Sequence, residues 1–583
     1  MLANSDIQRL YSQSGERTSH SIRGSQTIVG VPAMATKTKA IALIAFLMTV
    51  AIICRIVYLN TFNNNFLNKQ LDSRIMRTVK IPSMRGTIMD RNNNALAVST
   101  PVSSIWVDPT QLDDLSKSQV EAAAKILGMS VASLNSKLNQ KNKTFVYVKR
   151  AVTPAQAAQV LALGIDGIYS MQEYKRFYPY ANVTAHIVGF NNIDDNGAEG
   201  IEYADNKELV GHEGQEKILR DRRGHVVEKL GEVKAAEDGK NVVLAIDNKI
   251  QFIAYDALKK QVEKSNAVGG AAVVLDAKTG EVLAMVNMPS YNPNDRAGIT
   301  ANAVRNRANI DIYEPGSIIK PILVSRALDE GIVKPGTQFD THQYYVGTKL
   351  IKDDHAYPSM NVSEIIQHSS DIGTSKIALK LNKQDMWQYY QDMGFGHKVG
   401  TGFPGEATGI LRNWKKWYPI DQAEMGFGYG VSVSLLQMAR SYTVFTNHGC
   451  LLPITFYNED HSSQCKQIIS ANTAETMRQI LSQTTTDGTG RTAQTDDYTT
   501  AGKTGTAQKY TGGVYSNKQH YASFVGFAPA KDPKLIIAVT VDEPRKGGYY
   551  GAAVAAPVFA AIAQPALHEM GIIPDKNPQP TNH

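Results

Sequence analysis

Apolar positions along the chain fall first into one long continuous run. Residues 40–59 read AIALIAFLMTVAIICRIVYL, and Arg55 is the only charged residue among them. A helix of this length spans about 30 Å, the thickness of a bilayer core. Arg55 lies near the end of the run, where its long side chain can reach the interface, and Tyr58 stands where an interfacial aromatic is expected. The run therefore predicts a single transmembrane helix.

Two other interpretations of this run stay open, a cleaved signal peptide and a buried core helix. Against the first, the residues that follow, Asn60-Thr61-Phe62-Asn63, are not a small-residue cleavage site. Basic residues flank both ends of the run, but the nearest, Lys37 and Lys39, precede it. We therefore expect the N-terminus inside the cell. Residues 1–39 are rich in Ser, Thr, Gln and Arg, which is typical of a flexible cytoplasmic tail.

Residues 60–235 combine short strand and helix patterns. Alternating apolar residues over 77–109, with a polar turn at Asp90–Asn94, predict strands with a tight connection. Residues 117–165 look helical, as in SQVEAAAKILG and PAQAAQVLALG, and each of these segments ends at Gly. The mixture indicates an α+β module outside the membrane. It ends at a polar break, KAAEDG, over residues 234–239.

Residues 236–572 form the second and larger predicted domain. A strand at 241–247 leads into an amphipathic helix at 248–265, and residues 269–287 predict two strands joined by a Lys-Thr-Gly turn. Helical runs then alternate with strands; they cover residues 316–328, 362–381, 435–447 and 473–482. The polar, Pro-rich residues 573–583 are predicted to be a disordered tail. The fold class is α+β.

Composition excludes several classes of protein. Of 583 residues, 43% are hydrophobic and 20% are charged, which excludes a disordered chain, a collagen and a many-pass membrane protein. A net charge of +7 over this length is too weak to indicate a nucleic-acid partner.

The chain has only three cysteines, Cys54, Cys450 and Cys465, and no CxxC, which argues against a cysteine zinc site. Cys54 lies in the predicted membrane segment and is expected to act as a small apolar residue. Cys450 and Cys465 lie in a predicted hairpin outside the membrane. A disulfide and two buried thiols are both open for this pair. The histidines show no metal-binding spacing, and no metal site is predicted.

The first candidate for chemistry is Ser317-Ile318-Ile319-Lys320. Glu314-Pro315-Gly316 before it mark the start of a helix, and positions i and i+3 share one helix face. A serine hydroxyl needs a base beside it to act as a nucleophile, and a lysine can serve when burial or positive charge favours its neutral form. The same spacing occurs at Ser463–Lys466, in a polar stretch with no helix start, and we interpret that match as chance.

Two further segments complete a set. In Lys503-Thr504-Gly505-Thr506 the small residues allow a ligand close to a strand, while the lysine and the hydroxyls suit a carboxylate. A similar Lys278-Thr279-Gly280 is better explained as a hairpin turn. Ser369-Ser370-Asp371 alone is no more than a polar patch at a helix start. The order Ser-x-x-Lys, Ser-x-Asp, Lys-Thr-Gly within one predicted domain is more informative than any member.

This set resembles the motif triplet of penicillin-binding proteins and serine β-lactamases. The resemblance extends to RGTIMDRNNNALAVSTPVSSIWVDP, YPYANVTAHIVGF, GAEGIEY, GEVLAMVNMPSYNPND, RNRANIDIYEPGSIIKP, GFGYGVSVSLLQMAR and AGKTGTAQK. Together these segments are similar to the division-specific class B penicillin-binding proteins of the FtsI type. The resemblance implies an elongated, dimerisation-like pedestal over 60–235. It also implies a transpeptidase domain over 236–572 with an antiparallel sheet, flanking helices and a helical subdomain.

The resemblance also implies a reaction, the DD-transpeptidation that cross-links peptidoglycan at the septum without any cofactor. Ser317 would attack the bond between two terminal D-alanines, Lys320 would be its base, and Ser369 would pass a proton to the leaving amine. Lys503, Thr504 and Thr506, with Gly505 between them, would hold the substrate carboxylate. Lys503 would also favour the neutral form of Lys320, and the backbone N–H groups of Ser317 and Thr506 would form the oxyanion hole. β-Lactams would acylate Ser317.

Asp371 departs from the family pattern, which has Asn at this position. An amide donates hydrogen bonds, whereas an ionised carboxylate only accepts them and would stabilise the ammonium form of Lys320, against its role as base. Partial neutralisation by Lys503, protonation of Asp371 and altered substrate contacts are all open. We expect activity to survive and the rate of acylation by β-lactams to be altered.

Other functions with these motifs are a β-lactamase, a β-lactam sensor and an inactive division scaffold. A β-lactamase needs no module between anchor and catalytic domain, and the sensors carry a zinc protease whose HExxH is absent, the nearest string being His212–Glu216. The intact Ser317, Lys320 and Lys503 argue against a scaffold. The chain also lacks the motif of a fused glycosyltransferase. The resemblance therefore implies a separate FtsW-type polymerase and other division proteins as partners, at the inner membrane, with the catalytic domain in the periplasm.

Overall fold

The computed structural model describes residues 34–61, 76–112, 115–220, 226–459 and 464–576. The chain divides into two compact units, residues 1–77 and 78–583. The main described element of the first unit is helix α1 (Met34–Thr61), whose span Lys37–Leu59 is long and apolar enough to cross a membrane and is not buried. The predicted apolar helix at 40–59 is present and begins earlier, at Met34. Most of the predicted tail, residues 1–33, lies outside the described residues.

A second apolar stretch, Gly551–Glu569, also has the length of a membrane span, but 56% of it is buried. It comprises α20 (Gly551–Val554) and α21 (Ala556–Glu569). Phe559 and Ile562 on α21 are fully buried against the sheet of the second unit. This stretch is therefore a core helix of the second unit.

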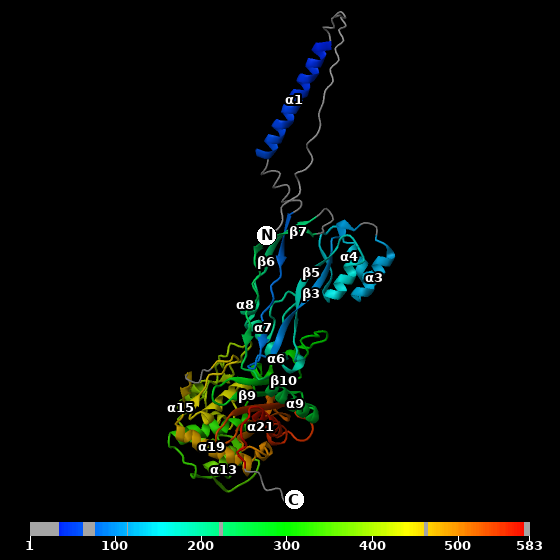
Figure 1. Cartoon of the computed structure of the whole chain (residues 1–583). Helices are drawn as coiled ribbons and strands as arrows, with labels where there is room; N and C mark the ends of the chain where they lie inside the picture. The colour runs from blue at the N-terminus through cyan, green and yellow to red at the C-terminus, as the bar shows by residue number, and fades with distance from the viewer. Residues whose placement is uncertain (1–33, 62–75, 113–114, 221–225, 460–463, 577–583) are drawn as a thin grey trace, which may run out of the picture. The chain divides into compact units, whose positions relative to one another are not determined.

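The N-terminal part of the second unit contains two sheets (Figure 1). The first has the order β1-β6-β7, formed by β1 (Met76–Ile81), β6 (Gly214–Arg220) and β7 (Val226–Lys234). The second has the order β4-β3-β2-β8, with β5 paired to β3; its strands are β2 (Ile88–Met89), β3 (Ala95–Val107), β4 (Val146–Val152), β5 (Ile168–Phe177) and β8 (Val242–Val243). The strands predicted over 77–109 and their tight connection are confirmed.

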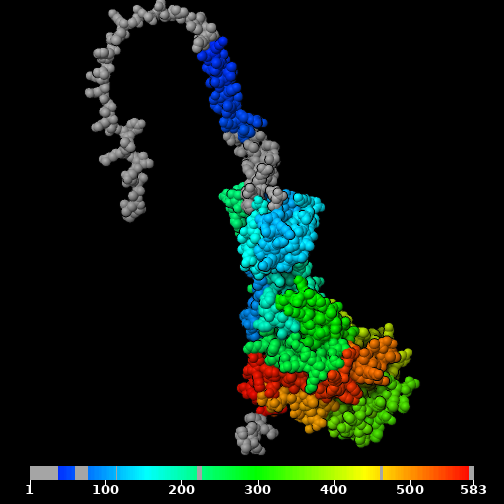
Figure 2. All heavy atoms as spheres, turned by 90° about the vertical axis from the view of Figure 1, so that its right-hand side faces the viewer, coloured from blue at the N-terminus to red at the C-terminus, as the bar shows by residue number. Residues whose placement is uncertain are grey.

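Three helices pack on the second sheet and gather with it into a compact lobe, drawn in cyan in Figure 2. They are α3 (Lys117–Leu127), α4 (Val131–Leu138) and α5 (Pro154–Leu161). Ser116 and Thr153 begin α3 and α5 with capping boxes, and Gly128 ends α3 in the left-handed conformation. The helical prediction for the whole of 117–165 was wrong over β4. There TFVYVKRAV alternates with period two, and the strand pairs with β3.

A buried ion-pair cluster holds the base of this module together. The Glu202 carboxylate accepts hydrogen bonds from Arg85 Nε and Arg176 Nε, each at 2.6 Å, and all three side chains are at most 1% exposed. Glu202 lies on α7 (Gly200–Ala204), and Arg176 lies on β5. The cluster therefore ties three distant sequence segments together through one carboxylate.

The C-terminal part of the second unit is built on a five-stranded antiparallel sheet with the order β10-β9-β21-β20-β19. Its strands are β9 (Gly269–Asp276), β10 (Val282–Met288), β19 (Ala501–Thr511), β20 (Val514–Ala528) and β21 (Leu535–Asp542). The hairpin predicted over 269–287 is confirmed, with Lys278-Thr279-Gly280 in its turn.

Both faces of this sheet are buried, because neighbouring residues of each strand enter different cores. Ala272 and Val274 of β9 pack with α21 and with α9 (Asn248–Ser265), the amphipathic helix predicted at 248–265. Val273 and Leu275 face the other core, together with α12 (Lys320–Asp329) and α17 (Leu435–Ser441). The antiparallel sheet with flanking helices that the resemblance implied is therefore present.

Two of the predicted helical runs are interrupted. Residues 362–381 form α13 (Val362–Gln367) and α14 (Asp371–Lys380), because Ser369 adopts a left-handed conformation with φ of 62°. Residues 435–447 form α17 and α18 (Thr443–Thr446). The run predicted over 473–482 is the longer α19 (Ala471–Thr486). Other helices of this part are α15 (Lys383–Asp392) and α16 (Pro419–Met425).

Cys450 and Cys465 form a disulfide with their Cα atoms 5.7 Å apart. It joins the short antiparallel strands β17 (Cys450–Leu451) and β18 (Lys466–Gln467), so the disulfide alternative holds. Cys54 is unpaired.

The predicted start of a disordered tail at residue 573 was too early. Asp575 accepts a hydrogen bond from the backbone N–H of Thr499 at 2.7 Å, and the Lys576 N–H donates to the Asp497 carbonyl at 3.1 Å. The polar composition suggested disorder here, but hydrogen bonds to residues 497–499 fix the positions of Asp575 and Lys576. Residues 577–583 lie outside the described residues.

Candidate active site

Ser317 lies in a single turn of 3-10 helix, η3 (Gly316–Ile319), directly before α12. Ile318 and Ile319, which follow Ser317 in the turn, are fully buried, whereas Ser317 is half-buried. The Tyr442 hydroxyl donates to the Ile318 carbonyl at 2.8 Å, and a Cβ at Gly428 would lie only 2.2 Å from the Gly316 carbonyl oxygen. The turn is therefore fixed by close packing around an accessible serine.

Lys320 begins α12, one helical turn after Ser317, and its side chain is fully buried. Its Nζ donates to the Ser369 carbonyl at 2.5 Å, the Ser369 hydroxyl at 3.3 Å and Asp371 Oδ1 at 2.6 Å. The first and second predicted motifs are thereby brought together. All three hydrogen bonds described for the Lys320 amine go to Ser369 and Asp371 of the Ser-x-Asp segment.

The Ser-x-Asp segment lies between α13 and α14. Ser370 begins α14, and its hydroxyl accepts from the Gly373 N–H at 2.8 Å. Asp353 accepts from the Ser370 hydroxyl at 2.5 Å and from the backbone N–H groups of Asp371 and Ile372 at 2.6 and 2.9 Å. Sequence reasoning missed Asp353, and no local signal marks it, since it is one of two aspartates in a polar loop.

The third predicted motif occupies β19, the edge strand of the sheet. A Cβ at Gly505 would lie 2.9 Å from Ile318 Cγ2 and 3.0 Å from the Pro315 carbonyl oxygen, so β19 lies directly against η3. Thr506 Oγ1 accepts from the Gly551 N–H at 3.1 Å. An edge strand leaves backbone groups available to a bound peptide, which can add to the sheet as a further strand.

Lys503 is fully buried, and its Nζ makes only long contacts, to the Thr504 carbonyl at 3.2 Å, Thr504 Oγ1 at 3.4 Å and Thr489 Oγ1 at 3.5 Å. Within the described ranges, no carboxylate lies within ion-pair distance of it. Thr489, whose hydroxyl also accepts from Thr504 at 2.9 Å, was missed by sequence reasoning. The Lys503 amine therefore lies among hydroxyl and carbonyl oxygens and could pair with a bound anion.

Electrostatics couple the three motifs. Burial, with a further contribution from the positive charge of Lys320, holds the pKa of Lys503 well below its usual value. Burial raises the pKa of Asp371 above its usual value, while Lys320 acts in the opposite direction. Lys503 and Lys320 are buried beside the partly exposed Asp371, and their charges influence one another.

Glu314 connects the Ser317 turn to the hairpin of β19 and β20. Its Oε1 accepts from the Gly430 N–H at 2.7 Å and from the Tyr515 hydroxyl at 3.1 Å, and burial raises its pKa. In the sequence this glutamate only marked the start of a helix. The structure assigns it a contact between two sides of the site.

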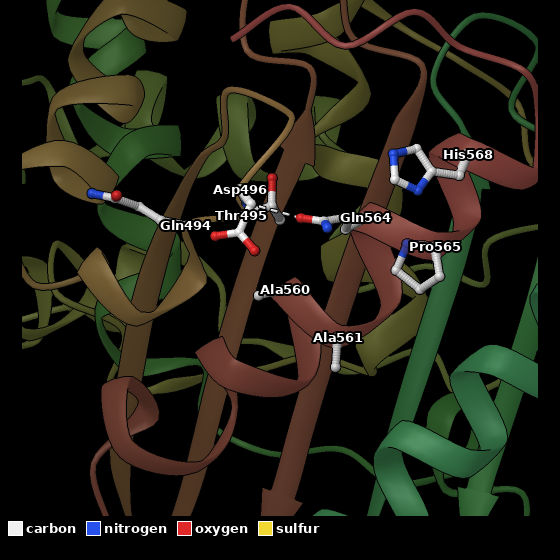
Figure 3. Close-up of a pocket in the computed structure, with 8 residues that line it drawn as sticks. All are labelled: Gln494, Thr495, Asp496, Ala560, Ala561, Gln564, Pro565 and His568. Atoms are coloured by element: carbon white, nitrogen blue, oxygen red, sulfur yellow. Dashed lines mark hydrogen bonds between the residues drawn. The ribbon is translucent and has the colours of Figure 1, made fainter. Parts of the chain in front are cut away.

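One hollow on the second unit lies away from the predicted motifs. A cavity of about 360 Å³ lies between α21 and the segment 494–496, on the α9 and α21 side of the sheet (Figure 3). Its lining includes Gln564, whose side chain accepts from the Asp496 N–H at 2.8 Å. Across the described ranges, no group of three His, Cys, Asp or Glu side chains could hold a metal ion. The second Ser-x-x-Lys match begins at Ser463, which lies outside the described residues.

Comparison with known proteins connects this geometry to a family. The penicillin binding protein transpeptidase domain matches residues 270–564, and the penicillin-binding protein dimerisation domain matches residues 80–244. The chain is 42% identical to the probable peptidoglycan D,D-transpeptidase PenA of Neisseria gonorrhoeae, over 93% of this chain and 94% of that protein. It is 35% identical to the peptidoglycan D,D-transpeptidase FtsI of Escherichia coli K12, over 89% and 90% of the two chains.

A solved structure agrees with the family match. The transpeptidase domain of penicillin-binding protein 3 from Burkholderia pseudomallei is 41% identical, with a TM-score of 0.53, and covers 57% of this chain and 98% of that one. The chain carries both domains of the family, and its relatives match it over nearly their whole length. The chain therefore belongs to the penicillin-binding proteins of the PenA and FtsI type, and it is a transpeptidase of that family.

Proposed function

We propose that this protein is a peptidoglycan D,D-transpeptidase of the division septum that works through an acyl-enzyme on Ser317. The observation that carries the proposal is the convergence of the three motifs. Lys320 bonds to Ser369 and Asp371, and the turn that holds Ser317 packs against the strand that holds Lys503, Thr504, Gly505 and Thr506.

The proposed reaction assigns a role to each of these groups. The stem peptide adds along β19, with its terminal carboxylate at Lys503, Thr504 and Thr506. Lys320 takes the Ser317 proton as Oγ attacks the carbonyl between the two terminal D-alanines, and the N–H groups of Ser317 and Thr506 stabilise the oxyanion. Ser369 passes a proton to the departing D-alanine. An amine of a second stem peptide then takes the acyl group and frees Ser317.

Labelling with a fluorescent penicillin, followed by intact-mass analysis, tests the nucleophile. The wild type is expected to gain the mass of one β-lactam, and Ser317→Ala is expected to gain none. Ser463→Ala, in the second Ser-x-x-Lys match, is the control and should label like the wild type. An adduct on Ser317→Ala, or none on folded wild type, would refute the assignment. Rapid release of hydrolysed drug would instead favour a β-lactamase.

We also propose that α1 spans the inner membrane with the N-terminus in the cytoplasm. The Cys450–Cys465 disulfide supports a catalytic domain in the periplasm, because disulfides persist in oxidising compartments. Protease added to intact spheroplasts should degrade the transpeptidase domain and leave a tag at the N-terminus protected. Protection of the transpeptidase domain from the protease would indicate the opposite orientation, with this domain in the cytoplasm.

An FtsW-type polymerase is the proposed partner, with the anchor and the module of residues 60–235 as its docking surfaces. The similarity to FtsI supports a role in division. A fluorescent fusion should gather at the division site and co-purify with that polymerase. Uniform membrane fluorescence throughout division would contradict the septal role.

A further inference from the structure

Lys320 has no free donor left for Ser317 when it is charged. An ammonium has three N–H groups, and Nζ has three described acceptors, the Ser369 carbonyl, the Ser369 hydroxyl and Asp371 Oδ1. The two shortest contacts, at 2.5 and 2.6 Å, lead to a carbonyl and a carboxylate, which are both acceptors only. This arrangement is the one that a buried ammonium requires.

The backbone that carries Asp371 is held in place independently of Lys320. Asp353 accepts the backbone N–H of Asp371 at 2.6 Å and that of Ile372 at 2.9 Å, which fixes the first turn of α14. The Asp371 side chain stays 36% exposed, while that of Lys320 is fully buried. The pair therefore has a route by which a proton can exchange with solvent, through the aspartate side.

The charged and titratable groups that face this pair come from several elements. Asp353 and Asp354, after β13 (Lys349–Ile351), add negative potential at Asp371. Lys503 on β19 acts on both members, and Tyr429, after α16, interacts with Asp371. Burial holds the pKa of Lys503 well below its usual value, so this lysine binds a proton less readily than an exposed one.

We propose that Asp371 acts as a positioning residue that holds the proposed base Lys320 as an ammonium, turned toward Ser369, so that acylation of Ser317 must wait for that proton to leave. The inference rests on the proposed function and deepens it. A proton first passes from the Lys320 ammonium to solvent by way of the exposed edge of Asp371. The neutral amine can then accept the Ser317 proton as the Oγ–carbon bond forms.

This device makes the rate of acylation depend on pH. Because a proton must leave the Lys320–Asp371 pair before acylation, the rate should increase about tenfold per pH unit until it levels off. Removing the carboxylate should move the midpoint of that rise to lower pH by about one unit or more, which is the usual effect of one close opposite charge. An amide at this position keeps the size of the side chain and removes only the charge.

The test measures the second-order rate of fluorescent-penicillin labelling of the full-length protein from pH 6 to 9.5, for wild type and Asp371→Asn. The wild type should show the rise, and Asp371→Asn should reach its plateau at lower pH and label about tenfold faster at pH 7. Asp354→Asn removes an exposed negative charge near the pair without a bond to Lys320, and it should follow the wild-type profile.

A flat wild-type profile would overturn the inference without any variant, and so would equal midpoints in wild type and Asp371→Asn. An equal shift of the midpoint in Asp354→Asn would show that any nearby negative charge has this effect, and that the specific contact between Asp371 and Lys320 is not its cause. If Asp371→Asn fails to fold by circular dichroism, Asp371→Ser provides the same comparison. The proposed function fails separately, through an adduct that persists in Ser317→Ala, whereas a pH-independent adduct on Ser317 overturns this inference alone.

Discussion

Gly505 allows the edge strand β19 to lie against the turn that carries Ser317. The missing side chain matters because a Cβ there would lie 2.9 Å from Ile318 Cγ2 and 3.0 Å from the Pro315 carbonyl oxygen. We expect Gly505→Ala to push β19 and η3 apart. A displacement of about 1 Å in a catalytic site typically costs about 10²-fold in rate, so penicillin labelling should slow to that degree.

The control for this prediction is Gly336→Ala, where a Cβ would meet nothing within 4 Å. It should label at the wild-type rate. Melting temperatures of both variants separate a local displacement from loss of fold. Labelling of Gly505→Ala at the wild-type rate would mean that the strand and the turn can separate without consequence.

Some residues of the site could be predicted from sequence and others could not, for a physical reason. The spacing of Ser317 and Lys320 places them on one helix face, whereas Lys503 was connected to them by the order of the three motifs and by the family resemblance. Asp353 and Thr489 reach the site from loops, and their contacts exist only after the chain folds. No pattern in the polar loop around Asp353 distinguishes it from its neighbour.

At the scale of elements, one carboxylate joins β5, α7 and the segment before β2. Glu202 is fully buried between Arg85 and Arg176, with both N–O distances at 2.6 Å. Glu202→Gln should leave two buried guanidinium groups without a countercharge, which typically costs about 3–5 kcal/mol. Urea denaturation of the purified protein measures this loss directly.

Glu208→Gln is the matched control for that variant. Glu208 pairs with Lys240 at 2.8 Å, but both side chains are at least half exposed. Exposed pairs contribute little to stability, so the control should unfold close to the wild type. Equal stability of the two variants would show that the buried cluster contributes little to the fold.

The disulfide acts on a second element, the β17–β18 hairpin. Cys450 and Cys465 close a loop with a sequence separation of 15. A loop of about this length is expected to contribute about 3 kcal/mol by restricting the unfolded chain. The double variant Cys450→Ser and Cys465→Ser should unfold at correspondingly lower urea concentration than the wild type, whereas Cys54→Ser should not.

Secondary structure could be predicted where a local sequence pattern determines it, and it was missed where tertiary contacts determine it. The helix at 248–265 and the hairpin at 269–287 have clear periodicity, and both are present. The strand β4 was hidden between two helical segments, and only its pairing with β3 gives it a place. The helix break at Ser369 depends on a left-handed backbone conformation that serine rarely adopts, so helix propensity did not indicate it.

At the scale of the whole second unit, His186 joins the dimerisation and transpeptidase domains. It lies on α6 (Ala185–Val188), and its Nε2 is 2.8 Å from the Ala303 carbonyl on α10 (Ala301–Val304). Its ring also packs edge to face on Tyr291. Burial lowers the pKa of His186 from 6.5 to about 4, because the contact surface does not solvate an imidazolium.

The lowered pKa makes the stability of this junction depend on pH. Above pH 6.5 His186 is neutral in both the folded and the unfolded chain, and its titration has no effect. Between pH 6.5 and about 4 the unfolded chain binds a proton that the folded chain does not, so stability falls as the pH falls, by up to about 3 kcal/mol.

Urea denaturation at pH 7.5 and pH 4.5 should show this loss in the wild type, and His186→Gln should show less of it, since glutamine does not titrate. The exposed His212, changed to Gln, should leave the wild-type pH dependence intact. If His186→Gln loses as much stability as the wild type on acidification, the junction does not depend on a neutral imidazole, and the acid sensitivity of the protein must come from other groups.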